Sequence, residues 1–151
     1  MYFNVVPQYK CNNNDNWNRV EDSVRQHAKQ FGVSLTVITG GHGQLHFKNI
    51  ADKDVPIFLG DNKVIVPKFM WKIVHLAGDT NSAIVFVSLN SPSASDMLKE
   101  CNQYICNNFF SPLFNEIKRG YTACCKVTDF IKYVEVPADM HTSNLLVNDL
   151  L

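Results

Sequence analysis

The sequence predicts an α+β domain, with a mixed or antiparallel central sheet and one long helix packed on a face of that sheet. Apolar residues recur at a helical spacing between residues 13 and 31. The stretch between residues 34 and 89 instead holds short runs of β-branched and aromatic residues, which are typical of strands. With 151 residues, the chain is long enough to bury a core, so we expect a single domain over residues 1–151.

The first element is expected to be a strand over residues 2–6, which Pro7 ends because proline lacks a backbone donor. Residues 12–16 favour a turn and a helix start, since Asn and Asp side chains accept backbone N–H groups. A helix over residues 13–31 should follow and stop at Gly32. Its apolar residues form one stripe toward the core: Trp17, Val20, Val24, Ala28 and Phe31.

Five strands are expected after this helix. They comprise residues 34–39, 55–59, 63–66, 69–76 and 83–89. Turns are expected at residues 40–43, 60–62 and 79–82, where Gly, Asp and Asn gather. The nearly continuous apolar run over residues 83–89 predicts a central strand. Trp71 and Phe86 are therefore expected in the core and not on a base-stacking surface.

Beyond Pro92 the pattern is less regular. Residues 95–106 and 112–118 are expected to be helical, and residues 128–134 fit either a strand or a helix. Residues 139–151 are expected to form a strap whose Leu and Val side chains dock on the body.

The five cysteines predict disulfides. Cys101, Cys106, Cys124 and Cys125 are close enough in sequence for at least one bridge, and Cys11 is the odd residue. A zinc site is the alternative, but the chain has no Cys-x-x-Cys pair, so disulfides are favoured.

The formal net charge is zero, which argues against strong electrostatic capture of long polyanions. Lys63, Lys68 and Lys72 lie on one segment, where they form either a substrate-facing patch or scattered surface charge. No run of eighteen apolar residues is present, so no membrane span is expected, and the start of the chain lacks signal-peptide features. No feature specifies an oligomeric state.

Glu21 and Arg25 are four residues apart and lie beside the apolar stripe of the predicted helix. From spacing alone they are a surface ion pair, worth about 0.3–0.5 kcal/mol.

A longer motif around this pair resembles the DNA/RNA non-specific endonucleases, which have the ββα-metal (His-Me finger) fold. The motif runs Asn4-Val5-Val6-Pro7-Gln8, then Asn13, then Trp17 and Arg19-Val20-Glu21. Nine residues separate Asn4 from Asn13 and eight separate Asn13 from Glu21, as in the second half of the family's active-site motif. Val37-Ile38-Thr39-Gly40, Val66-Pro67-Lys68 and Trp71-Lys72 resemble later elements, and the cysteine-rich tail most resembles the secreted arthropod branch.

This resemblance implies roles for individual residues. Asn13 would be the one direct protein ligand of a hydrated divalent cation, Mg²⁺ or another hard cation such as Mn²⁺. Glu21 would hold a water bound to that cation, and Asn4 would fix the geometry of the hairpin beneath it. Arg25 would neutralise phosphate charge in the transition state, and Lys68 and Lys72 would face substrate.

The implied activity is the hydrolysis of DNA and RNA to 5′-phosphate ends by an extracellular enzyme, with little base specificity because the site holds the nucleic-acid backbone. The family's general base is a His in an upstream Arg-Gly-His motif. None of the five histidines here follows Arg-Gly, and only three residues precede Asn4, so the chain is expected to lack that first arm. His42 and His46 are weaker candidates to reach the phosphate. The alternative function is a pseudonuclease that binds nucleic acid or a protein partner without cutting, and a cysteine-braced structural module is a further one.

Overall fold

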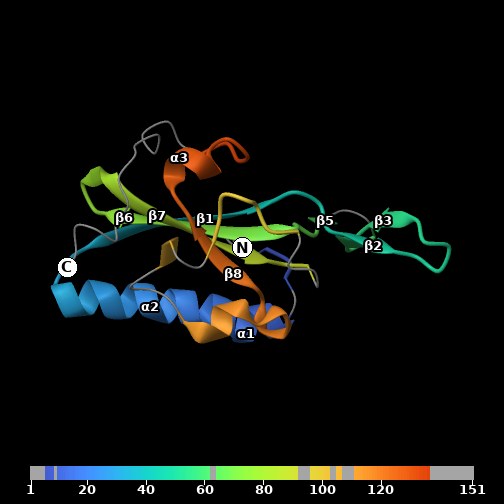
Figure 1. Cartoon of the computed structure of the whole chain (residues 1–151), viewed down its shortest axis with the longest axis horizontal. Coiled ribbons are helices and arrows are strands. Elements are labelled where there is room, and N and C mark those ends of the chain that lie inside the picture. Colours follow the sequence, from blue (N-terminus) through green and yellow to red (C-terminus); the bar gives the residue numbers. More distant parts are fainter. Residues whose placement is uncertain are drawn as a thin grey trace.

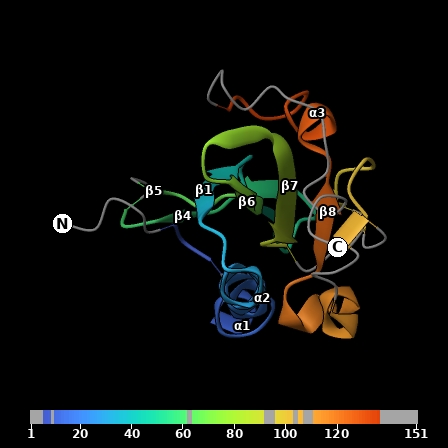
Figure 2. The same cartoon turned by 90° about the vertical axis from the view of Figure 1, so that its left-hand side faces the viewer.

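The structure, a computed structural model, describes residues 6–8, 10–61, 64–91, 96–102, 105–106 and 111–136. Within these residues a four-stranded antiparallel sheet, in the order β1-β6-β7-β8, lies between two layers of helix (Figure 1). Helices α1 and α2 cover one face, and α3 lies beyond the other, as the view along the sheet shows (Figure 2). The predicted α+β class with an antiparallel sheet is confirmed. The expectation of one domain over residues 1–151 stays a prediction.

Helix α2 spans Asn16–Phe31 and ends at Gly32, which adopts the left-handed conformation with φ of 63°. The long predicted helix is therefore confirmed. The stripe was misjudged at its end, because Phe31 is 41% exposed and His27 takes the buried position of the last turn. Positions 20, 24 and 27 follow the 3.6-residue period more closely than positions 20, 24 and 28.

Helix α1 spans Lys10–Asn14, where the sequence predicted a turn and a helix start over residues 12–16. The turn is limited to Asp15, and the helix begins earlier than expected because tertiary hydrogen bonds override the turn propensity of Asn12. Asn12 and Asn16 are buried and bond to the sheet and to the segment before β8, so they are not available to cap turns.

Strand β1, Leu35–His42, pairs along its whole length with β6, Phe69–Leu76. The predicted turn at residues 40–43 begins later than expected, since the strand continues to His42 and only Gly43 has positive φ. Gly40 is needed for packing, because a Cβ atom there would overlap the Trp71 ring.

Strand β7, Asp79–Leu89, lies between β6 and β8, Thr122–Cys125, as a central strand should. The predicted turn at residues 79–82 was wrong, because these residues belong to β7. Ala77 and Gly78 make the reversal, with Gly78 at φ of 84°. The pairing register then shifts between His75 and Leu76.

Two small hairpins extend from one end of the sheet, at the right of Figure 1. β2, His46–Lys48, pairs with β3, Asp54–Pro56, and β4, Phe58–Leu59, pairs with β5, Val64–Ile65. The predicted hairpin around residue 60 is confirmed over β4 and β5, and Gly60 and Asp61 both have positive φ.

The remaining described elements are short. The predicted helix over residues 112–118 consists of two 3₁₀ turns, η3 at Pro112–Asn115 and η4 at Ile117–Arg119, because Glu116 between them is extended. Helix α3, Val127–Phe130, shows that the last ambiguous stretch begins as a helix. In the described part of residues 95–106 there is no α-helix, since Asn102 forms a β-bridge with Cys124. The predicted strap at 139–151 lies outside the described residues.

Side chains alternate along the strands, so each face of the sheet has its own apolar cluster. The α2 face holds Val20, Val24, Val74, Ile84, Phe86 and Phe114. The α3 face holds Trp71, Ile73, Val85, Val87, Val127 and Phe130, among others. Trp71 and Phe86 are buried in the core, as predicted. No helix in the described residues is long and apolar enough to cross a membrane.

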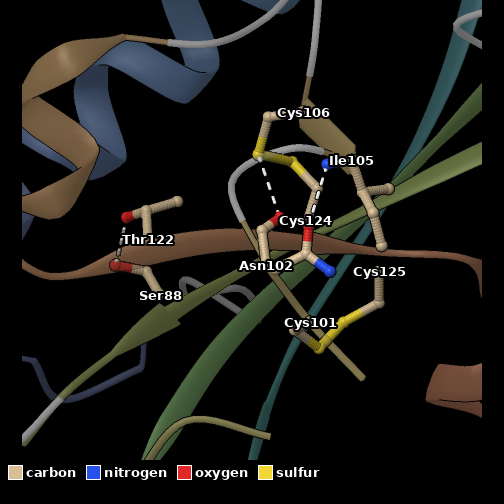
Figure 3. Close-up of a disulfide and its surroundings, with 8 residues drawn as sticks. All are labelled: Ser88, Cys101, Asn102, Ile105, Cys106, Thr122, Cys124 and Cys125. Carbon is tan, nitrogen blue, oxygen red and sulfur yellow. Dashed lines mark hydrogen bonds between the residues drawn. A yellow bond between two sulfur atoms is a disulfide. The ribbon is translucent and has the colours of Figure 1, made fainter. Parts of the chain in front are cut away.

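The predicted disulfides are confirmed as two bonds, Cys101–Cys125 and Cys106–Cys124 (Figure 3). Because neighbouring side chains on a strand point to opposite faces, Cys124 belongs to the α2-face cluster and Cys125 to the α3-face cluster. The two bonds therefore fasten Cys101 and Cys106 to opposite faces of β8. The side chain of Cys11 lies outside what the structure describes.

Candidate active site

A cleft of about 660 Å³ opens on the α2 face of the sheet, between the helices and strands β1 and β6. Its wall combines three separate stretches of the chain: the segment before α2 together with the first turns of α2, the middle of β1, and the start of β6. The lining side chains used below are Gln8, Asn13, Trp17, Glu21, Thr39 and Lys72. Of the predicted site residues, the fold therefore brings Asn13, Glu21 and Lys72 together.

Asn13 presents its carboxamide to this cleft from the last turn of α1, and its side chain is exposed. Its Oδ1 accepts a hydrogen bond from Nε2 of Gln8, the final residue of the predicted Asn-x-x-Pro-Gln motif. A carbonyl oxygen has two lone pairs, so this bond orients the amide and leaves one acceptor position for a cation.

Lys72 is the buried charge of the cleft, with only 7% of its side chain exposed. Its Nζ lies 3.2 Å from Glu21 Oε1 and 4.9 Å from the centre of the Trp17 ring. A carboxylate and an aromatic face therefore both compensate the desolvated ammonium. Trp17 and Glu21 lie one turn apart on α2, so Lys72 contacts both of them at once. These two contacts hold all three side chains in place.

Arg25 lies at the rim of the cleft and does not line it. Its guanidinium is 3.5 Å from Glu21 Oε2 and 2.9 Å from Asp22 Oδ1, and its side chain is 68% exposed. Glu21 thus joins a buried cation, Lys72, to an exposed one. Its remaining N–H groups have no acceptor among these two contacts, since a guanidinium carries five donors.

Lys68 lines a different hollow of about 390 Å³, together with Gln44, His46 and Asp54. Its Nζ is 3.1 Å from Asp96 Oδ1, so its charge is paired there. The predicted Lys68–Lys72 pair is therefore split between two hollows. Asn4 lies outside the described residues.

No histidine lines the cleft in the part of the chain that the structure describes. The His42 ring stacks on Phe69, and His46 lies in the hollow with Lys68. His27 is buried against Phe31, and this burial lowers its pKa from 6.5.

Asp15 joins α1 to α2 and is the centre of an ion-pair network beside Asn13. Arg19 and Arg119 both donate to its carboxylate, and Arg119 also pairs with Glu116 at 2.7 Å. Burial raises the pKa of Asp15, but the hydrogen bonds and positive charges of Arg19 and Arg119 together outweigh it and lower the pKa from 3.8.

Oxygen ligands dominate the cleft, which suits a hard divalent cation. Asn13 Oδ1 and the Glu21 carboxylate are the donors from the protein, and no group of three or more His, Cys, Asp or Glu capable of holding a metal occurs among the described residues. Mg²⁺ keeps most of its waters and needs few protein oxygens, so this donor set fits it and does not fit zinc.

Several residues of the site were not identified from the sequence. Trp17 was named in the core stripe and in the motif but was given no contact with a charge, and the burial of Asn12 and Asn16 was hidden in a run interpreted as a turn and a helix start. The four-residue spacing of Asn12 and Asn16 was a usable signal, because residues four apart lie on the same side of a helix.

Comparison with known proteins identifies the family of the chain. The pattern of the DNA/RNA non-specific endonuclease family matches residues 1–130. The chain is 35% identical over 150 residues to a salivary endonuclease of Lutzomyia longipalpis, covering 95% of the chain and 36% of that protein. It is 33% identical over 151 residues to salivary protein Tsal1 of Glossina morsitans morsitans, covering 96% and 37%.

A third relative, salivary protein Tsal2A of the same fly, is 31% identical and covers 96% of the chain and 38% of its own length. The chain thus spans little more than a third of the curated relatives it matches. All three are insect salivary proteins, which confirms the predicted likeness to the arthropod branch. The chain belongs to the DNA/RNA non-specific endonuclease family.

Proposed function

We propose that this chain carries the metal-binding and phosphate-binding groups of a metal-dependent endonuclease. The enzyme would hydrolyse phosphodiester bonds of both DNA and RNA and leave 5′-phosphate ends. The observation that carries the proposal is the convergence of Asn13, Glu21 and Lys72 on one cleft from α1, α2 and β6. Membership of the family and the name of the Lutzomyia relative support it.

Asn13 would hold Mg²⁺, or another hard cation such as Mn²⁺, through the lone pair that Gln8 leaves available. When bound, the cation supplies positive charge against the leaving 3′ oxygen and the scissile phosphate. Glu21 would orient a water in the cleft through its carboxylate. Its bonds to Lys72 and Arg25 restrict its rotation, so that water would be held in one position.

Lys72 would bind a phosphate oxygen at the floor of the cleft. Its ammonium can donate three hydrogen bonds, of which Glu21 takes one. Arg25 would add charge from the rim. These groups contact the backbone and not the base edges, so little sequence preference is expected. Lys68 would contribute only to a more distant part of the strand, since it lies in the second hollow.

The group that takes the proton from the attacking water is proposed to lie outside this cleft. No histidine lines the cleft in the described residues, and none of the five in the sequence follows Arg-Gly. This same observation favours the second candidate function, a pseudonuclease that binds nucleic acid or a protein partner without cutting. An extracellular location is proposed from the two disulfides and the salivary relatives.

The test is a plasmid-nicking and RNA-cleavage assay with the purified chain, in Mg²⁺, in EDTA, and with added imidazole as a diffusible base. We expect cutting that requires Mg²⁺, that imidazole raises, and that falls about 100-fold or more in Asn13→Ala. Asn14→Ala is the matched control, because Asn14 is the exposed neighbour and does not line the cleft. The cleaved ends should be ligatable, because they should carry 5′-phosphate groups.

Binding without cutting, in Mg²⁺ and imidazole alike, would move the assignment to the pseudonuclease. If nucleic-acid binding were also unchanged in Asn13→Ala and Arg25→Ala, the cleft would have no role in it, and a structural module would remain. Full activity of a His42→Ala, His46→Ala double variant would exclude both histidines as the base.

A further inference from the structure

A buried polar network ties α1 to the sheet, and we propose that it positions Asn13 in the cleft. The network, here called the α1 anchor, consists of Asn12, Asn16, Ser88 and Thr122, each no more than 2% exposed. The inference rests on the proposed function in one respect, the role of Asn13 as metal ligand. The residues of the anchor themselves touch neither the cleft nor a substrate.

Asn12 has both ends of its carboxamide bonded to the sheet. Its Nδ2 donates to the carbonyl of Leu89 at 3.2 Å, and its Oδ1 accepts from Ser88 Oγ at 2.8 Å. Thr122 Oγ1 lies 3.0 Å from Ser88 Oγ and extends the network to β8 (Figure 3). Because donor and acceptor sides are both satisfied, rotation of this amide by 180° would break two buried bonds.

Asn16 makes the second connection, one helical turn further along the chain. Its Nδ2 donates to the carbonyls of Leu113 and Gly120, both at 2.7 Å. Gly120 has φ of 86°, and a Cβ atom there would overlap the Asn12 side chain. The chain before β8 thus approaches α1 as closely as glycine allows, and the two asparagines hold it there.

Asn13 lies between these two anchored residues. A five-residue helix cannot maintain itself, so the position of α1 must come from tertiary contacts. Asn12 faces the sheet, and the next residue, rotated by about 100°, faces the cleft. Directional hydrogen bonds restrict sliding and rotation of α1 more than apolar contacts would, which makes Asn12, Asn16, Ser88 and Thr122 positioning residues for the Asn13 amide.

The experiment uses the intact chain and Mn²⁺ alone as the probe. Electron paramagnetic resonance titration gives the Kd for Mn²⁺, and ¹⁵N NMR reports the side-chain amide of Asn13 and hydrogen exchange in α1. The variants are Asn12→Leu, which keeps the branched shape but removes both bonds, and the milder Ser88→Ala. Thr122→Val and Thr122→Ser form a matched pair, since only the second keeps the hydroxyl.

We expect Asn12→Leu, Ser88→Ala and Thr122→Val to weaken Mn²⁺ binding, by about tenfold for the first. They should also shift the Asn13 amide resonances and speed exchange in α1, whereas Thr122→Ser restores wild-type values. Unchanged Mn²⁺ affinity and Asn13 resonances in folded Asn12→Leu or Ser88→Ala would overturn the proposal and leave the anchor a purely structural feature.

Asn13→Ala separates this result from a failure of the proposed function. If that variant binds Mn²⁺ as tightly as the wild type, Asn13 is not the metal ligand and the proposed function fails at that step. The NMR measurements on the other variants still decide whether the anchor controls the Asn13 side chain.

Discussion

The two faces of the sheet are built from the same strands but serve different purposes. Toward α3, β6 and β7 present Trp71, Ile73 and Val87, which pack with Phe130 in an apolar core. Toward α2, the neighbouring positions include Lys72 and Ser88, which are equally buried but bonded to polar partners. The period-two alternation thus lets one pair of strands supply an apolar cluster on one side and, on the other, an apolar cluster joined by buried polar groups, of which Lys72 lines the cleft. Changes in the α3-face cluster should therefore affect stability alone, whereas changes of the polar groups on the α2 face should affect function.

The largest expected effect is a loss of stability in Phe130→Ala. Phe130 is 1% exposed, and its ring meets the Trp71 ring edge-on at 5.6 Å. Truncation should lower the free energy of unfolding by about 3–5 kcal/mol, measured by urea denaturation. Mn²⁺ affinity of the folded protein should not change. A weakened Kd would show that the two faces are coupled.

Each disulfide should contribute about 2–4 kcal/mol, since both close loops of moderate length. Cys101–Cys125 spans 24 residues and Cys106–Cys124 spans 18, so loop entropy predicts that the first contributes more by only about 0.3 kcal/mol. Paired Cys→Ala variants and urea denaturation measure this. A difference above 1 kcal/mol would mean that the faces of β8 are packed unequally.

Lys72→Met should have the opposite effect to Phe130→Ala, because it should reduce activity more than stability. Removing one partner of a fully buried ion pair costs about 3–5 kcal/mol, but Glu21 is 29% exposed and keeps Arg25 at 3.5 Å, so the free energy of unfolding should fall by less than about 2 kcal/mol. Nucleic-acid cleavage should fall about 100-fold, because a donor to the phosphate is lost. Calorimetry measures the change in stability, and the nicking assay measures the change in cleavage. Equal losses in stability and activity would contradict the division of the faces.

His27 should make stability pH-dependent near neutrality. Burial lowers its pKa from 6.5, so between pH 6.5 and the folded-state pKa the unfolded chain binds more protons. The free energy of unfolding should therefore fall as the pH drops below 6.5. In His27→Leu this part of the pH dependence should vanish, and urea denaturation between pH 8 and pH 5 measures it.

Asp15 should give the smallest effect, at lower pH. Its pKa is below 3.8 in the folded protein, so its stabilising contribution is present above that value and is lost as the pH falls through the folded-state pKa. The carboxylate is partly exposed, which limits the size of the contribution. The stability difference between wild type and Asp15→Asn should shrink steadily from pH 5 to pH 2.

The sequence predicts best where local pattern and tertiary packing agree. The α2 stripe and the apolar run of β7 were identified because burial alone explains their spacing. Helix α1 was missed because its asparagines are used in long-range bonds that span 77 residues in the case of Asn12 and Leu89. Local propensity carries no trace of such partners.

The site, like the fold, was predicted from the sequence only in part. The family resemblance pointed to Asn13 and Glu21, and both line the cleft although they lie on two different helices, α1 and α2. Lys68 and Lys72 are four residues apart, which is about 13 Å along a strand, so they reach different hollows. A residue count cannot reveal where one hollow ends and the next begins.

The adjacent cysteines of β8 also determine which bonds can form when the chain oxidises. Four thiols allow three pairings, but Cys124 and Cys125 point to opposite sides of a paired strand. Exchanging their partners would require Cys101 and Cys106 to reach the opposite faces of β8 from those they now contact. Once β7 and β8 have paired, the pleat itself therefore selects the nested isomer, in which the 101–125 loop encloses the 106–124 loop.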